Sequence, residues 1–435
     1  MRKREDNELK NSGIDWIGKI PAIWDMSRAG FIFNHKKDIA KTESHKYERL
    51  SLTMQGVLPR SKEDTNGLAP DNFDGYQIVK PNDLLFKLID LANIATSRVG
   101  LSAHEGIVSG AYVRLECSAS IIPKYAYYFY MDMYNRNVFN GLGSGVRSAL
   151  NAKDLLKLKF PLPDLATQQR IAAFLDTETS KIDALSEELT KFKSNLLLQK
   201  RSLVSECVTK GIPSERDRAY KDSGLNYLSD VMPLVWEKFR LKNVLSGTSS
   251  GATPASGDDS YYTDDENAMP WVAIGDMGEN FTSSTKNSVT EKALKDCRLK
   301  VVPSGTLLYS MYASVGFVSE LTMEATTNQA ILALYLNEDV CNKRFVKYWL
   351  KNMRFYVDRL TSVSTQSNLN ANKVINLDLF LPPLDEQQRI ADYLDSETAK
   401  IDALIGEIDN QVNLLKTYRK SLINEVVTGK IEVKS

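Results

Sequence analysis

Two stretches of the chain place apolar residues at steps of three and four, the spacing that puts them on one face of a helix. The first series contains Ile182, Leu185, Leu189, Phe192, Leu196 and Leu203, with polar Gln199 in step. The second contains Ile401, Leu404, Ile408, Leu415, Tyr418 and Leu422, with polar Gln411 in step. Such alternation is a heptad seam. It predicts two long helices that end near Thr209 and Thr428.

Both helices lie in an internal repeat, the feature to look for first because it sets the architecture. Residues 150–212 align without a gap onto 369–431, and 29 of the 63 positions are identical. The densest match is Gln-Gln-Arg-Ile-Ala at 168–172 and 387–391. We expect a short helix from Gln168 to Leu175, with Asp176 and Asp395 as caps of the longer helices that follow. Each long helix could pack on its own neighbouring domain, but matched seams favour packing of the two on each other as a coiled-coil spacer.

The segments outside the repeat share an outline but little sequence. Val-Lys-Pro-Asn-Asp-Leu-Leu-Phe at 79–86 resembles Val-Val-Pro-Ser-Gly-Thr-Leu-Leu-Tyr at 301–309, and each half later has an aromatic helical stretch. Strand-like runs and turn signals surround them. We therefore predict an α+β protein with two globular domains of one fold. The expected order is a globular domain at 1–150, a helical repeat at 151–212, a globular domain at 213–368 and a helical repeat at 369–435.

Composition narrows the class of protein. The 435 residues predict more than one domain, and 55 basic residues balance 55 acidic ones. This balance argues against a free-standing nucleic-acid binder, which is usually strongly basic, but it leaves local basic faces open. Four dispersed cysteines and three histidines predict reduced thiols and no metal site. The charged N-terminus without an apolar stretch behind it predicts no secretory signal and a cytoplasmic location.

One segment has the form of a catalytic motif. Phe-Asn-Gly-Leu-Gly-Ser-Gly at 139–145 resembles the nucleotide loop of S-adenosylmethionine-dependent methyltransferases. Such a loop should follow a buried strand, whereas here a helix-like aromatic stretch precedes it. The Asp/Asn-Pro-Pro-aromatic signature of amino-methyltransferases is also absent from the sequence. We therefore favour a turn, and the lack of other catalytic motifs favours a binding protein.

Polar residues of the two variable domains are candidate DNA contacts. Arginine pairs with guanine edges, Asn and Gln pair with adenine edges, and lysine binds phosphates. Any one of these side chains is more often a solvated surface group. The candidates are Arg60, Lys62, Arg98 and Arg147 in the first domain, and Ser250, Thr253, Lys286, Thr327, Asn328, Gln329 and Gln366 in the second.

Three sequence features together resemble one family. They are Ser-Gly-Ile-Asp-Trp-Ile-Gly at 12–18 with Trp24 after it, Leu-Pro-Pro-Leu-Asp-Glu-Gln-Gln-Arg-Ile at 381–390, and Lys-Ile-Asp at 400–402. In these features the whole chain resembles the specificity subunit of a type I restriction–modification system. The first repeat departs from the pattern, with Pro-Asp-Leu-Ala-Thr at 163–167.

The resemblance implies a fold and a set of partners. Two target-recognition domains are held apart by an antiparallel coiled coil, and each reads one half of a bipartite, asymmetric site on double-stranded DNA. The subunit is non-catalytic and needs no cofactor of its own. Two modification subunits, expected at Gln168, Arg170, Gln387 and Arg389, use S-adenosylmethionine, and restriction subunits use ATP and Mg. The alternative is a coiled-coil scaffold that binds only proteins.

Overall fold

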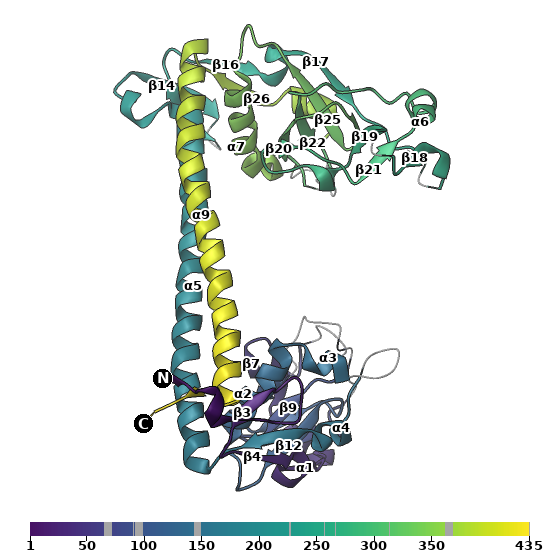
Figure 1. Cartoon of the computed structure of the whole chain (residues 1–435). Coiled ribbons are helices and arrows are strands. Elements are labelled where there is room, and N and C mark those ends of the chain that lie inside the picture. Colours follow the sequence, from purple (N-terminus) through teal and green to yellow (C-terminus); the bar gives the residue numbers. More distant parts are fainter. Residues whose placement is uncertain are drawn as a thin grey trace. The chain divides into compact units, whose positions relative to one another are not determined.

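A computed structural model describes residues 1–64, 72–89, 91, 99–142, 149–225, 228–255, 257–265, 267–312, 314–361 and 369–434 (Figure 1). Arg98, Arg147 and Gln366 lie outside these residues. The chain forms two compact units, a first unit of residues 1–190 with 409–435 and a second unit of residues 191–408. It passes between them inside two long helices, α5 (Leu165–Lys210) and α9 (Leu384–Val427).

The globular part of the first unit has two four-stranded sheets. One has the order β10-β9-β12-β5 and the other β7-β6-β11-β8, in which β6 and β11 are parallel. The strands of these sheets are β5 (Phe33–Asn34), β6 (Arg49–Thr53), β7 (Gly56–Arg60), β8 (Gln77–Val79), β9 (Leu84–Phe86), β10 (Val99–Leu101), β11 (Gly106–Val108) and β12 (Val113–Cys117).

The globular part of the second unit also has two sheets, one of five strands and one of four. One sheet has the order β17-β25-β22-β23-β20, and the other is β18-β21-β19-β24, in which β19 and β24 are parallel. The strands are β17 (Leu245–Ser250), β18 (Tyr262–Thr263), β19 (Met269–Val272), β20 (Phe281–Thr282), β21 (Asn287–Val289), β22 (Leu307–Ser310), β23 (Val318–Leu321), β24 (Thr326–Thr327) and β25 (Ile331–Leu336). The expectation of two α+β domains of one fold is confirmed.

The remaining strands pair in twos, and most pairs have a counterpart in the other unit. Hairpin β2 (Leu9–Asn11) with β3 (Lys19–Pro21) corresponds to β14 (Tyr220–Leu225) with β15 (Ser229–Pro233). The pair β4 (Asp25–Arg28) with β13 (Lys159–Leu162) corresponds to β16 (Glu237–Arg240) with β26 (Asp378–Leu381). Strand β1 (Arg2–Lys3) pairs with β27 (Ile431–Glu432). Residues 159–162 of the first repeat and 378–381 of the second thus belong to the globular part of their units.

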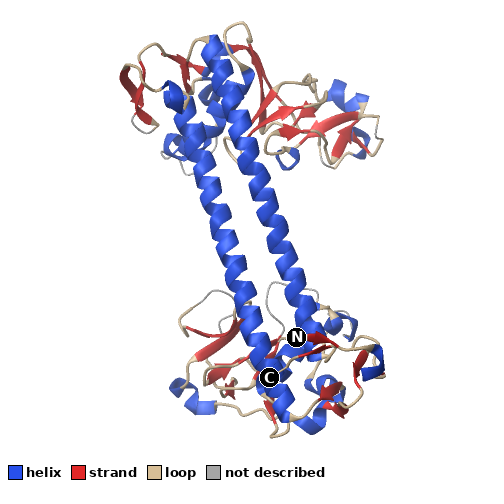
Figure 2. Ribbon diagram, turned by 60° about the vertical axis from the view of Figure 1, so that its left-hand side comes forward, coloured by secondary structure: helices blue, strands red, loops and turns tan. Residues whose placement is uncertain are grey.

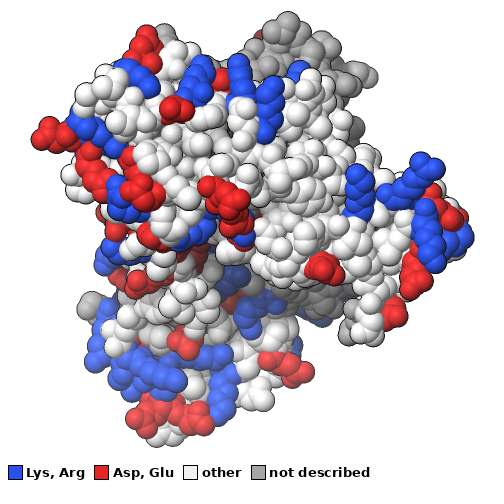
Figure 3. Space-filling view, turned by 90° about the horizontal axis from the view of Figure 1, so that it is seen from above, with Lys and Arg blue, Asp and Glu red and all other residues white. Residues whose placement is uncertain are grey.

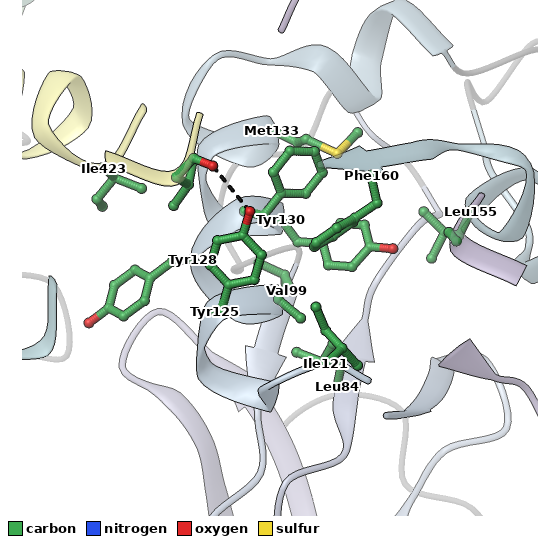
Figure 4. Packing of buried hydrophobic residues seen from close by; sticks show 14 of the residues in the cluster. Leu84, Val99, Ile121, Tyr125, Tyr128, Tyr130, Met133, Leu155, Phe160 and Ile423 are labelled. Atoms are coloured by element: carbon green, nitrogen blue, oxygen red, sulfur yellow. Dashed lines mark hydrogen bonds between the residues drawn. The ribbon is translucent and has the colours of Figure 1, made fainter. Parts of the chain in front are cut away.

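A core of aromatic side chains fixes the first domain to the long helices. It forms where α2 (Pro123–Asn135) packs on the sheet, and Tyr130 and Phe160 are fully buried in it (Figure 4). The hydroxyl of Tyr125 donates to the carbonyl of Val427 in α9 at 3.3 Å. In the second unit α7 (Lys343–Thr361) takes the place of α2, with Trp349 buried against Phe380. The shorter helices are α1 (Ala29–Ile32), α3 (Val138–Leu142), α4 (Ala152–Lys157), α6 (Glu291–Asp296) and α8 (Ala371–Ile375).

The long helices differ from the prediction at their beginnings. Each is continuous from its Gln-Gln-Arg-Ile run onward (Figure 2), so the predicted break before Asp176 and Asp395 is wrong. Both aspartates lie within the helices, and their carboxylates bind side chains of the globular domains. Asp176 accepts a hydrogen bond from the Tyr128 hydroxyl at 2.8 Å, and Asp395 accepts one from Tyr348 at 2.7 Å.

The seam between the helices also differs from the prediction at every second position. Between 182 and 203 the side chains of α5 that are at least half-buried are Ile182, Ser186, Leu189, Lys193, Leu196, Lys200 and Leu203, and those of α9 include Ile401, Ile405, Ile408, Val412, Leu415, Arg419 and Leu422. This is a regular four–three alternation. Predicted members such as Leu185 and Leu404 are exposed instead, because Ser186 and Ile405 occupy the inward positions. Because several seam positions are polar, a pattern of apolar residues alone does not reveal this register.

Candidate nucleic-acid interface and partner surfaces

Five of the sequence-predicted DNA contacts come together in the second domain. The segment after β17 runs against residues 327–331, with the Ala252 N–H donating to the Thr327 carbonyl at 3.0 Å. A Cβ on Gly251 would lie 1.9 Å from the Thr327 oxygen, so only glycine allows this approach. The Thr253 hydroxyl donates to the Gln329 side chain. Ser250 and Asn328 flank the same contact in sequence.

The residues of this cluster differ in exposure, which separates side chains that could contact DNA from those that stabilise the loop. Ser250, Thr253 and Gln329 are exposed. Thr327 is 2% exposed, and Asn328 uses its side-chain oxygen to accept the Ala330 N–H at 3.1 Å. The first three side chains are therefore available to a ligand, while the last two hold the loop.

Lys286 adds an exposed cation to the same sheet. It precedes β21, which pairs with β19, which pairs in turn with β24 beside the cluster. Neighbouring strands are about 4.8 Å apart, so two strand spacings separate these rows. At this separation Lys286 could bind a phosphate while the Gln329 amide binds a base edge.

The first-domain candidates that the structure describes are already engaged. Arg60, at the end of β7, binds Asp64 at 2.8 Å, and this hydrogen bond raises the pKa of the arginine. Lys62 donates to the Ser44 carbonyl at 2.9 Å, and its ammonium lies 5.8 Å from the centre of the Phe73 ring. The two residues hold a loop together. On the face drawn in Figure 3, basic and acidic side chains are interspersed, in keeping with the neutral composition.

The methyltransferase-like motif does not follow a strand. Its Phe139 is buried in α3, which comes after α2, and residues 143–145 lie outside the described part. Among the described residues there is no group of His, Cys, Asp and Glu placed to hold a metal ion. No described helix is long and apolar enough to cross a membrane.

The glutamines of the repeat have an internal role. Gln168 is 1% exposed; its oxygen accepts the Ile122 N–H at 2.8 Å, and its nitrogen donates to the Pro163 carbonyl at 2.8 Å. Gln387 makes the same bonds with Asn342 and Pro382, at 2.7 and 2.8 Å. Each thus ties the start of α2 or α7 to a long helix.

The arginines of the repeat are exposed. Arg170 donates to the Thr167 hydroxyl at 2.8 Å, and Arg389 binds Asp385 at 2.6 Å and Glu215 at 3.3 Å. Both arginine side chains are therefore accessible to a partner subunit.

An exposed apolar stripe follows the seam of the helix pair. Leu185 and Phe192 are each 46% exposed, and Tyr418 is 50% exposed. In the first unit, Leu185, Leu189, Leu414, Leu415 and Tyr418 line a hollow of about 290 Å³ together with Gln411. Contiguous exposed apolar surface on a helix is typical of a docking site.

A family model of the type I restriction modification DNA specificity domain matches residues 25–194 and 233–414, which is most of the chain. The chain belongs to this family. The specificity subunit of the type I restriction enzyme MjaVIII from Methanocaldococcus jannaschii is 25% identical over 99% of this chain and 97% of its own length. That of the enzyme StySPI from Salmonella potsdam is 20% identical over 95% and 90%.

Solved structures share the fold of this specificity protein. A chain from work on complex assembly and conformational transition of the type I R-M system has a TM-score of 0.74, with 17% identity over 95% of this chain and 99% of that chain. The HsdS subunit of Thermoanaerobacter tengcongensis has a TM-score of 0.52, with 17% identity over 95% and 98%.

Family membership fixes the general role. The protein is the DNA specificity subunit of a type I restriction–modification system, a non-catalytic component that works in a complex with other subunits. Sequence reasoning missed the anchors Tyr128–Asp176 and Tyr348–Asp395. The only signal for them was that both aspartates recur in the repeat.

Proposed function

We propose that each globular domain reads one half of a bipartite, asymmetric DNA site. The observation that carries this proposal is that the two domains are built from similar pairs of sheets but have different exposed side chains. In the second domain Thr253, Gln329 and Lys286 are the readers, with Ser250 beside them. Side chains of these kinds bind base edges and phosphates in the grooves of DNA.

In the first domain Arg60 and Lys62 bind the DNA backbone. Each is held by an internal partner, which fixes the cation in place before DNA arrives. A pre-positioned cation suits a phosphate better than a base edge, since phosphate contacts set orientation. Arg98 and Arg147 of this domain, and Gln366 of the second, remain proposed contacts.

The long helices set the distance between the two half-sites. The chain passes between its units only within α5 and α9, which pair through ion pairs in both units. Each helical residue adds about 1.5 Å along the axis, so helix length translates directly into spacing.

The exposed stripe and the two repeat arginines dock the modification subunits. Leu185 and Leu404 are exposed apolar residues at equivalent repeat positions, whereas Phe192 and Tyr418 correspond to Gln411 and Gln199. Arg170 and Arg389 are also equivalent positions, so each repeat can dock one modification subunit. S-adenosylmethionine then belongs to the modification subunits, and ATP and Mg belong to the restriction subunits.

Footprinting of the chain with its modification subunits on DNA tests this proposal. We expect two protected patches separated by an accessible gap. A single continuous patch would contradict the two-reader proposal. No protection at all would favour the protein-only scaffold.

A further inference from the structure

The second unit contains a groove that DNA reading and partner docking leave unused. Its volume is about 810 Å³, within the range of small-molecule sites. Side chains from α5, α7, α9 and the β20 and β23 region line it. Leu197 and Leu198 of α5, together with Phe281 and Phe317, give it an apolar lining.

Lysines converge on this groove from two helices. Lys351 of α7 hydrogen-bonds a neutral partner, the Asn280 side-chain oxygen, at 2.5 Å. Burial, and next the charge of Lys347, lower the pKa of Lys351 to about 8. Lys347 is offset by Glu320 at 3.2 Å, and Lys200 by Asp402 at 2.6 Å. Lys351 therefore differs from Lys347 and Lys200 in having no carboxylate at hydrogen-bond distance among the described residues, so an anionic ligand could bind it.

A buried hydrogen-bond donor lies beside Lys351. Asn352 lines the groove and is 2% exposed, yet its Nδ2 has no hydrogen-bond partner among the described residues. A buried amide without a partner costs free energy, so a ligand that accepts a hydrogen bond from Asn352 would stabilise this region.

The first unit has different residues at the equivalent positions. The bonds of Tyr128 with Asp176 and of Tyr348 with Asp395 align α2 with α7 at an offset of 220. Met131 then corresponds to Lys351, and Asp132 to Asn352.

Those first-unit residues are internally satisfied. Met131 packs against the core of the first domain. Asp132 accepts hydrogen bonds from Arg136 and from Asn424, the latter at 3.0 Å. A partner that docks on both repeats would need the same donors in both units. The donors Lys351 and Asn352 occur only in the second unit, so they indicate a ligand that binds once per chain.

We infer that this groove binds a nucleoside monophosphate. The Lys351 ammonium and the Asn352 amide would hold the phosphate, because both donate and neither meets a carboxylate at hydrogen-bond distance among the described residues. Phe281 is 54% exposed, with the Lys347 ammonium 4.1 Å from the centre of its ring, and its exposed part would contact the base. Glu279, which also lines the groove, would accept a hydrogen bond from a ribose hydroxyl.

Isothermal titration of the full chain with adenosine 5′-monophosphate, inorganic phosphate and adenosine tests this inference. We expect the nucleotide to bind about tenfold or more tightly than either fragment, because it alone uses both the donors and the apolar wall. Lys351→Met introduces the residue of the first unit and should weaken binding by about ten- to a hundredfold. Lys373→Met, at an exposed position of α8, is the matched control and should bind as the parent does.

Asn352→Asp is a second variant should Lys351→Met fail to fold, since Asp132 occupies the equivalent position. It adds a negative charge beside the phosphate and should also weaken binding. Absence of binding at millimolar nucleotide, or equal binding by the parent and both groove variants, would overturn the inference. Displacement of the nucleotide by a DNA duplex would assign the groove to backbone phosphates and overturn it as well.

Discussion

Arg419 of the second repeat donates from Nε and Nη2 to the carboxylate of Asp183 in the first, at 2.8 and 3.0 Å. Lys200 of the first repeat binds Asp402 of the second at 2.6 Å. Asp183 and Asp402 are equivalent repeat positions, as are Lys200 and Arg419. The residue numbers of each pair sum to 602, so both pairs have one antiparallel register. The repeat is thus its own partner, with each aspartate meeting the cation of the other copy.

The first prediction concerns this register. Asp183→Arg should lower the free energy of unfolding through repulsion with Arg419, and adding Arg419→Asp should restore it. Both groups are partly exposed, so we expect a coupling of about 0.2–1 kcal/mol. Denaturant unfolding of the parent, both single variants and the double variant measures it. Purely additive effects would show that the pair does not define the register.

The second prediction concerns Gln168. Gln168→Met keeps the size of the side chain but leaves the Ile122 N–H and the Pro163 carbonyl without their partner. We expect a loss of about 1–3 kcal/mol in stability, visible as a lower Tm. Gln169→Met, at the exposed neighbouring position, is the control and should change little. Unchanged stability with lost partner assembly would instead make Gln168 a docking residue.

The sequence was enough to predict the helices and the duplicated domains, because a repeat carries the same pattern twice. It could not predict that Asp176 continues a helix, since the tyrosine that binds it is 48 residues away. Every second position of the seam was predicted one residue too early. Leu185 is apolar and Ser186 is polar, so the hydrophobicity pattern favoured the wrong one of the two.

The candidate DNA contacts show a similar division. Residue type identified Thr253 and Gln329, which the fold brings together although they are 76 residues apart. Residue type could not separate them from Thr327 and Asn328, which support the loop, because burial depends on strands far away in sequence.

The third prediction separates base reading from phosphate binding in the second domain. Gln329→Ala should relax specificity at one base pair of one half-site, at a cost of about 1–3 kcal/mol. Lys286→Ala should weaken binding to all sequences alike and reduce the salt dependence by about one ion. Binding to DNA libraries at several salt concentrations distinguishes the two effects. A change in both half-sites from Gln329→Ala would contradict the assignment.

The fourth prediction concerns spacing. Residues 196 and 406 face each other in the register that the ion pairs define. Four residues inserted after Leu196 and four after Ile405 therefore extend both helices at one level, by about 6 Å. Because B-DNA rises about 3.4 Å per base pair, the target should keep its half-sites and gain one or two base pairs between them. An active variant with the original spacing would show that other subunits set the distance.

An exchange of the second recognition domain tests the central claim most directly. Residues 241–377 lie between β16 and β26, which pair antiparallel, so the ends of the exchanged segment meet at one place. The donor should be a relative that retains Arg344 and Tyr348, because these anchor α7 to Asp395. The measurement is a map of methylated adenines in cells that contain the chimera and its modification subunits. We predict that one half-site changes to that of the donor while the other half-site and the spacing stay the same. A simultaneous change in both half-sites would contradict the assignment of one reader to each domain.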